Sequence, residues 1–406
     1  MTRENIIETA FEVWGRDLYK TTSLSQISGE LGVSKAALYR HFKNKDALLE
    51  AMNTTFFDEC AGFIKTSFDG ALFTKDRLEA VLIMMKKVSE YYILNPGAFI
   101  FALVKVTGAY DKERMINEFR SRGIDFKLFA RREGKDYPSK IQLIMLTLTF
   151  SLAQFHRLKE NKYPTNAQVK KAILEIENRV MKGLDLDERK VAAIDFQKLE
   201  QQAAGHTHEY TENNALLKAV AGVVAEAGPW NASMEMVAKR SGLSKSGLYA
   251  HFKNKQDMLN RLFTSEFSRI VDFAKEQIAT SNIAEEQLYL GIISIIGYLR
   301  SRPEILLAAD WIKSNQFKLG NEMPVRLYDI IGNIKIKTIM KQDIHYLVWI
   351  AQWILFMIIS SLAWYPRSGS LVNQKDNWAN NAAEVPNKCF RILFRFIALG
   401  LGGSKI

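Results

Sequence analysis

The chain has 406 residues, of which 48% are hydrophobic and only 8 are proline. This composition excludes a disordered chain, and the length exceeds that of one ordinary domain. The formal net charge of +11, from 55 Lys and Arg against 44 Asp and Glu, favours a polyanionic partner such as nucleic acid or an acidic membrane surface.

Two features bear on the compartment. The first residues run directly into an amphipathic pattern and lack the apolar core and cleavage site of a signal peptide. The two cysteines, Cys60 and Cys389, cannot form a disulfide framework and indicate a reducing environment. We therefore expect a cytoplasmic protein.

The first predicted elements are three short helices. Apolar residues from Ile6 to Trp14 share one helical face, which predicts a first helix with a buried stripe. Ser23 stands where a helix N-cap is needed, and Gly32 follows Leu31 where a helix-ending, left-handed residue is needed. Ser34 then caps a third helix, so the turn between the second and third helices is tight.

The third helix has two distinct faces. Leu38 and Phe42 are four residues apart and face the core, which leaves Lys35, Tyr39 and Arg40 on the opposite side. Basic and hydroxyl side chains on an exposed helix can contact base edges and phosphates in a major groove. The alternative is a small helical domain with a solvated basic face.

An internal repeat defines the organisation of the chain. Residues 34–45 recur as residues 244–255, at an offset of 210, with nine of the twelve positions identical. The offset holds back to the first helix, so a whole domain is duplicated. Farther on, residues 91–96 resemble residues 298–303, which indicates that the helical region downstream is duplicated too. Residues 184–209, polar and helical in the middle, are predicted to be the linker.

The remaining sequence predicts only helices. In the first half these cover 78–94, 97–107, 114–131, 139–159 and 167–182, and similar stretches run from 285 to 386 and beyond. Residues 346–364 are uncharged and mostly apolar over about the length that spans a bilayer. Because Gln352 and two serines interrupt them and no second such segment occurs, we expect a helix buried in the core, with membrane insertion as the alternative.

Large apolar side chains among the middle helices are candidates for an effector pocket, although an aromatic residue at helical spacing is more often part of the core. The candidates are Phe99, Phe101, Phe129, Met145, Trp311, Trp349, Trp353 and Phe356. The sequence has no phosphate-binding glycine loop, no nucleophile motif and no readable carboxylate pair, so we predict no enzyme activity, no cofactor and no metal site.

The segment Leu-Tyr-x-His-Phe-Lys-Asn-Lys, at 38–45 and again at 248–255, resembles the signature of the TetR family of transcriptional regulators. The resemblance is close over about 3–52 and 213–262. It implies an all-α fold of two tandem units, each a three-helix helix-turn-helix domain with a helical regulatory domain, joined by a pseudo-symmetric four-helix bundle. The bundle would combine 139–159 and 167–182 with 343–364 and 385–401. The implied domains are 1–50 and 210–260 for DNA binding, 51–183 and 261–406 for regulation, and 184–209 as the linker.

The resemblance also implies which residues contact DNA. In the first copy they are Ser25, Lys35, Ala36, Ala37, Tyr39, Arg40, His41 and Lys45. In the second copy they are Lys245, Ser246, Gly247, Tyr249, His251 and Lys255. The copies differ at two further positions, because Glu235 replaces Ser25 and Ala250 replaces Arg40, so we expect the second copy to bind more weakly.

The function implied is that of a repressor that reads an imperfect palindrome in double-stranded DNA and is released by a small apolar or cationic effector. The two halves would pair within one chain, and further dimerisation stays open. Two alternatives are a DNA-binding regulator controlled by a protein partner and a membrane-associated regulator.

Overall fold

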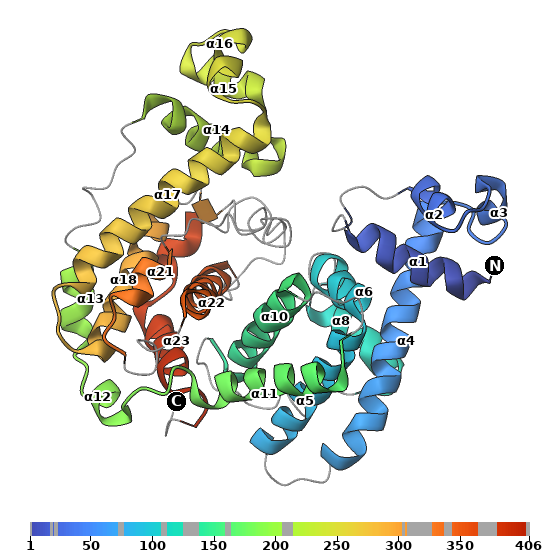
Figure 1. Cartoon of the computed structure of the whole chain (residues 1–406), viewed down its shortest axis with the longest axis horizontal. Helices are drawn as coiled ribbons and strands as arrows, with labels where there is room; N and C mark the ends of the chain where they lie inside the picture. Colours follow the sequence, from blue (N-terminus) through green and yellow to red (C-terminus); the bar gives the residue numbers. More distant parts are fainter. Residues whose placement is uncertain are drawn as a thin grey trace. The chain divides into compact units, whose positions relative to one another are not determined.

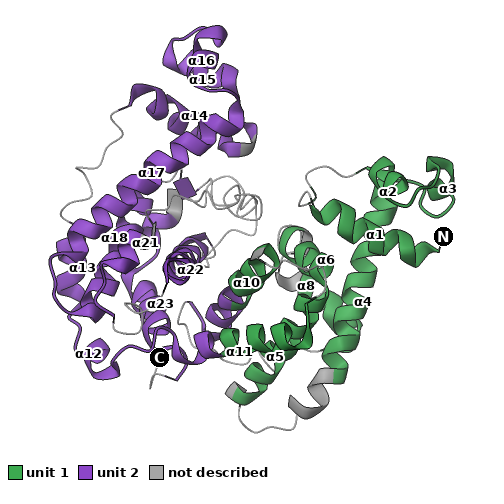
Figure 2. Ribbon diagram, viewed as in Figure 1, with its two compact units in different colours: residues 1–135, 148–177 green, residues 136–147, 178–406 purple. Residues whose placement is uncertain are grey.

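The computed structural model (Figure 1) is helical, with no strand among the residues that it describes, as the sequence predicts. The described residues are 2–16, 19, 23–71, 77–106, 112–124, 138–158, 164–204, 214–302, 305–306, 327–336, 343–363 and 380–402. The chain divides into two compact units (Figure 2). Unit 1 comprises Met1–Lys135 and Leu148–Glu177, and unit 2 comprises Asp136–Thr147 and Asn178–Ile406.

Unit 1 begins with the three short helices that the sequence predicts, and a long helix follows them. Its helices are α1 Arg3–Arg16, α2 Leu24–Glu30, α3 Lys35–Tyr39, α4 Lys45–Ala71, α5 Arg77–Leu94, α6 Pro96–Phe101, the π-helix η1 Ala102–Val106, and α8 Lys112–Ser121. The predicted helix 114–131 ends early, because Gly123 adopts a φ of +80° that stops α8. Residues 125–131 of that prediction lie outside the described residues.

One apolar core runs through unit 1 from the first helices to α8. Ile6, Trp14 and Leu38 are fully buried in it, together with Phe57 of α4. Phe101 of α6 packs edge-on against Phe11 of α1, with ring centroids 5.1 Å apart. The three-helix domain therefore shares its core with the helices that follow it, and α4 belongs to both.

Unit 2 repeats this order. Its helices are α12 Glu188–Ala192, α13 Phe196–Ala204, α14 Ala215–Asn231, α15 Met234–Ser241, α16 Lys245–His251, α17 Lys255–Ile278, α18 Ala284–Ser301, α21 Leu327–Gly332, α22 Ile344–Ala363, the 3₁₀-helix η2 Asn380–Glu384, and α23 Asn387–Leu399. α14 to α17 correspond to α1 to α4. α17 packs closely along α18 (Figure 1).

Two helices, α10 (Lys140–Leu158) and α11 (Asn166–Lys182), contribute residues to both units. Within unit 2, Trp353 of α22 donates its indole N–H to the Thr147 hydroxyl at 3.3 Å. The backbone N–H of Leu184 donates to the carbonyl of Ile397 on α23 at 2.8 Å. These are helices that the sequence assigns to the four-helix bundle, and the bundle itself stays a prediction.

The predicted linker is a packed part of unit 2 as far as Ala204, and residues 205–209 lie outside the described residues. Its helical middle forms two helices rather than one, because residues 193–195 between α12 and α13 are not helical. Glu200 of α13 accepts two hydrogen bonds from Arg391 of α23, at 2.8 and 2.9 Å. It also accepts one from the Tyr289 hydroxyl of α18 at 2.6 Å. A carboxylate thus fixes the connecting segment to two helices of the second half.

The apolar segment near residue 350 forms α22. Among the described residues, α22 is the one helix long and apolar enough to cross a membrane, with a mean hydropathy of 1.9. In this structure 67% of that stretch is buried inside the protein. This burial favours the predicted core helix.

We expect Glu200→Ala to lower the free energy of unfolding by about 2 kcal/mol, because Arg391 and Tyr289 would lose their buried acceptor. Urea denaturation followed by circular dichroism measures this change. Gln201→Ala, on the exposed face of the same helix, is the matched control and should change little. An equal loss in both variants would contradict the role of the ion pair.

The Glu200 site also predicts how the stability of the protein changes with pH. Burial opposes ionisation of Glu200, but the hydrogen bonds from Arg391 and Tyr289 outweigh it and hold the pKa of this carboxyl below its ordinary value of 4.5. Its stabilising contribution is therefore present at neutral pH and is lost as the pH falls from 4.5 through the lower folded-state pKa. Glu200→Gln should flatten the acid limb of stability against pH, relative to the unsubstituted chain.

Candidate nucleic-acid interface

Each three-helix domain is built around a tight turn between its second and third helices. Gly32 and Gly242 adopt φ values of +64° and +72°, the left-handed region that glycine enters without strain. Ser34 then accepts from the backbone N–H of Ala37 at 3.2 Å. Ser244 accepts from Gly247 in the same way at 3.0 Å. The turn and the N-cap predicted for the first copy are confirmed, and the second copy repeats both.

The third helix of each domain presents its predicted faces. Leu38 and Leu248 are fully buried, and Phe42 and Phe252 beside them are 2% exposed. The tyrosines on the opposite face, Tyr39 and Tyr249, are 51% and 48% exposed. Large aromatic side chains held this far out of the core are available to a partner.

The candidate DNA-contacting residues gather on the outward side of each domain. In the first domain the exposed ones are Ser25, Lys35, Ala36, Tyr39, Arg40, His41 and Lys45, and Ala37 is half-buried. In the second domain the exposed ones are Lys245, Ser246, Tyr249 and His251, and Gly247 and Lys255 are half-buried. Each domain therefore forms a surface that could face a DNA groove.

A long helix begins directly after this surface in each half. Asn44 accepts from the backbone N–H of Ala47 at 2.8 Å, and Asn254 accepts from that of Asp257 at 2.9 Å. Both asparagines are thus N-caps of the long helices. The positive end of the helix dipole and a lysine, Lys45 or Lys255, lie together at each start, an arrangement that suits a phosphate group.

The second domain holds an ion pair that the sequence analysis missed. Glu235 of α15 lies 2.5 Å from the Nζ of Lys245 at the start of α16. The hydrogen bond and charge of Lys245 lower the pKa of Glu235, and Glu235 in turn raises the pKa of Lys245. The sequence predicts weaker DNA binding by the second copy because Glu235 replaces Ser25, and in the structure the charge of Glu235 is paired with a candidate DNA-contacting lysine. The first domain has Ser25 and Lys35 at these positions.

The first helix ends differently in the two domains. Gly228 adopts a φ of +73° in the second domain. Its counterpart Leu18 lies outside the described residues, but Tyr19 beside it adopts a φ of +58°, which is uncommon for a residue with a side chain. Tyr19 is buried, and its ring packs edge-on against Phe101 at 5.6 Å. Packing of the ring offsets the backbone strain in the first copy.

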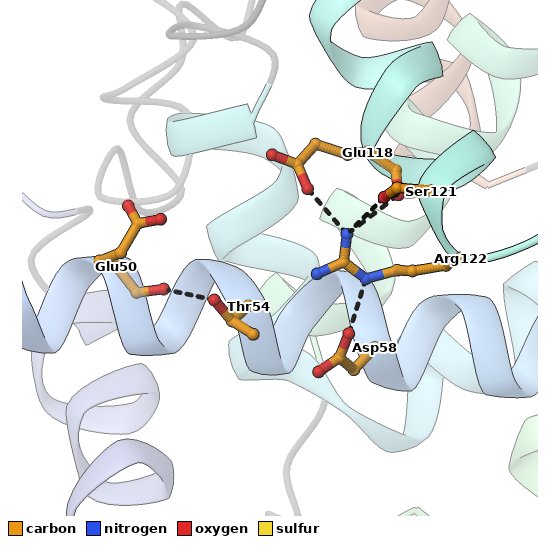
Figure 3. Close-up of polar contacts among 6 residues, drawn as sticks. All are labelled: Glu50, Thr54, Asp58, Glu118, Ser121 and Arg122. Atoms are coloured by element: carbon orange, nitrogen blue, oxygen red, sulfur yellow. Dashed lines mark hydrogen bonds and ion pairs between the residues drawn. The ribbon is translucent and has the colours of Figure 1, made fainter.

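An arginine connects α4 to α8 in unit 1 (Figure 3). Arg122 follows α8 and donates to Asp58 of α4 at 2.6 Å and to Glu118 of α8 at 2.7 Å. Its guanidinium also lies 5.5 Å from the ring centre of Phe57. Residues 58 and 122 are far apart in sequence, so no local pattern could have predicted this contact.

The effector candidates in unit 1 occupy the core. Phe101 packs beneath α1, and Phe99 packs against Tyr92 and His156 with ring centroids 5.6 and 5.4 Å apart. Phe129 and Trp311 lie outside the described residues, and Met145, from a helix shared between the units, is 40% exposed.

In unit 2 the candidate aromatics surround a cation of the chain itself. The guanidinium of Arg179 lies 5.2 and 5.4 Å from the ring centres of Trp349 and Trp353. It also donates to the Tyr346 hydroxyl at 2.6 Å. Phe356 on the same helix is half-buried. These aromatic side chains of α22 thus stabilise the structure through a cation–π contact with a residue of the same chain.

A small apolar cavity of about 10 Å³ lies elsewhere in unit 2, with room for about one water molecule. Its walls come from α18, α21 and α22, and include Ile292, Ile331 and Ile354. None of the eight effector candidates lines it.

The paired exposed helices, each held at a fixed angle by a glycine turn, define a helix-turn-helix DNA-binding protein. The family model for bacterial regulatory proteins of the tetR family matches residues 6–52 and 216–262. The chain therefore contains two copies of the DNA-binding domain found in regulatory proteins of the tetR family. The family consists of regulators rather than enzymes, as the sequence predicts.

Curated relatives match over short regions. The fatty acid metabolism regulator protein of Bacillus subtilis (strain 168) is 31% identical over 77 residues, which is 19% of this chain and 40% of that protein. The HTH-type transcriptional regulator YerO of the same organism is 40% identical over 47 residues, 12% of this chain and 16% of that protein. The chain thus spans less than half the length of these relatives.

A solved structure is also similar to this chain. It is the TetR family transcriptional regulator PfmR from Thermus thermophilus, with 22% identity and a TM-score of 0.30. The match covers 44% of this chain and 95% of that one.

We expect Gly32→Ala to destabilise the first helix-turn-helix domain by about 1 kcal/mol, because alanine is strained at this positive φ. The space around Gly32 is open, so the cost is conformational only. Gly29→Ala, three residues earlier in α2 and also in open space, should have no such cost and is the control. Amide hydrogen exchange of α2 and α3 reports both changes. Equal protection in the two variants would contradict the assignment of the turn.

Proposed function

We propose that this chain is a repressor in which both DNA-binding domains of one molecule bind a single, imperfectly palindromic operator. The observation that carries the proposal is the presence of two complete helix-turn-helix surfaces on one chain, each with its glycine turn, serine cap and exposed tyrosine. Other helix-turn-helix proteins bring two such surfaces to DNA by dimerising. Here one chain carries both.

The imperfection of the palindrome follows from the unequal surfaces. Near its third helix the first domain carries four basic side chains, namely Lys35, Arg40, Lys43 and Lys45. The second domain carries three, namely Lys245, Lys253 and Lys255. Of these, Lys245 is already paired with Glu235. We infer that the first domain supplies most of the affinity and that the two half-sites differ in sequence.

The proposal includes release by a small effector, apolar or cationic, bound in a regulatory domain. The half-buried aromatic side chains of α22 support this part, since they already accommodate a guanidinium. Control by a protein partner is the alternative. Thermal-shift screening with and without operator separates the two, because an effector coupled to DNA must bind with a different affinity when operator is present.

The experiment that tests the DNA-binding arrangement is a mass measurement of the complex at nanomolar protein, on DNA selected from a random pool. One chain per operator is the expected result, because both binding surfaces are already present. A complex that always contains two chains would overturn the arrangement without affecting the assignment of the family.

Arg40→Ala tests the inequality of the half-sites. If Arg40 contacts a base, its loss should weaken binding by about 1–3 kcal/mol and relax sequence preference in one half-site only. Ala250→Arg, at the equivalent position of the second domain, is the matched gain-of-contact variant. Selection of bound sequences for each variant gives the preference, and equal relaxation in both half-sites would count against the proposal.

Glu235→Ser makes the second domain like the first at this position and should free Lys245 for a phosphate. One additional phosphate contact should steepen the slope of log affinity against log salt by about 0.9. Ser25→Glu in the first domain is the reciprocal variant and should flatten the slope. Fluorescence anisotropy over a salt series measures both, and unchanged slopes would show that the ion pair does not limit binding.

A further inference from the structure

The two helix-turn-helix domains contain the same ion pair with the charges exchanged. At the offset of 210, Arg16 corresponds to Glu226 and Glu30 corresponds to Arg240. The first domain thus carries the arginine on its first helix and the glutamate on its second. The second domain carries the glutamate on its first helix and the arginine on its second.

Both pairs are formed. In the first domain, Arg16 donates through both terminal nitrogens to the two carboxylate oxygens of Glu30, at 2.6 and 3.1 Å. In the second domain, Arg240 donates to Glu226 at 2.5 Å. Each pair joins the end of the first helix to the second helix, across 14 residues of sequence. The contact is therefore retained, while its polarity is reversed.

The neighbouring position has changed along with the pair. Position 12 is glutamate in the first domain, where its charge also acts on Arg16. The corresponding residue of the second domain is Gly222, and the guanidinium of Arg240 lies over it. A Cβ at position 222 would stand 2.5 Å from the Nε of Arg240. The residues on the first helix of each domain thus match the charged residue on the second helix of the same domain.

A chain with two copies of one domain is exposed to a particular error during folding. The first helix of one copy can dock on the second helix of the other copy, within a chain or between two chains, and multidomain and repeat proteins characteristically misassemble in this way. With the charges as they are, such exchange would place Arg16 against Arg240 and Glu226 against Glu30. Like charges at a contact discriminate against the wrong partner.

We propose that the exchanged ion pairs determine which first helix packs on which second helix, and so prevent exchange of helices between the two DNA-binding domains. The apolar faces of the two first helices also differ in size, since Phe11 and Trp14 of α1 correspond to the smaller Ala221 and Val224 of α14. Shape and charge both oppose the wrong pairing. The charges are the part that substitution can alter without disturbing the core.

The test uses four versions of the full chain. Arg16→Glu/Glu30→Arg reverses the pair in the first domain, so that each domain keeps an internal pair but both now have the same polarity. Glu226→Arg/Arg240→Glu does the same in the second domain. The fourfold variant reverses both pairs and restores opposite polarity. Glu12 lies beside position 16 in every version, where its charge favours Arg16 and disfavours a glutamate. The double variant of the first domain is therefore compared with the fourfold variant, which carries the same residues at positions 12 and 16.

Each version is unfolded in urea, refolded at micromolar concentration and separated by size with light-scattering detection. We expect both double variants to yield about fivefold more helix-exchanged dimer and aggregate than the unsubstituted chain, and the fourfold variant to return to its level. Thermal melting of the refolded monomers checks that the internal pairs have formed. Double variants that refold like the unsubstituted chain, or a fourfold variant as impaired as the double variants, would overturn the proposal.

Discussion

The tight turn between the second and third helices is the constraint on which the candidate interface depends. A glycine at positive φ ends one helix, and a serine two residues farther on caps the next, so only one short connection is available to the backbone. The turn fixes the angle between the helices. With Leu38 or Leu248 buried beneath, the third helix can rotate neither toward nor away from solvent, and its outward residues are held ready for a groove.

This constraint is local, which explains why the sequence predicts so much of both domains. The caps at Ser23, Ser34 and Asn44 and the turn at Gly32 depend on neighbours within about four residues. The duplicated copy repeats each of these signals. Their recurrence at one offset makes the assignment much firmer than a single motif would.

The features that the sequence could not predict are contacts between residues far apart in the chain. Glu200 meets Arg391 across 191 residues, and Asp58 meets Arg122 across 64. Nothing in a helical pattern specifies which charged residue of a distant helix lies opposite. The effector candidates were uncertain for a related reason. Aromatic residues at helical spacing fill a core as readily as they line a pocket, and only the packing of Phe101, or of Arg179 beside two tryptophans, distinguishes the two.

Because the two copies lie on one chain, a substitution can alter one DNA-binding domain without altering the other. In a symmetric homodimer every substitution occurs twice, so the two DNA-binding surfaces stay identical. In this chain each copy varies independently. Glu235, Ala250 and the reversed pair of Glu226 with Arg240 occur in one copy only. The turn that positions the third helix has been kept in both, because any change there costs the interface itself. The side chains around it have diverged, as a chain that carries two separate copies of the domain permits.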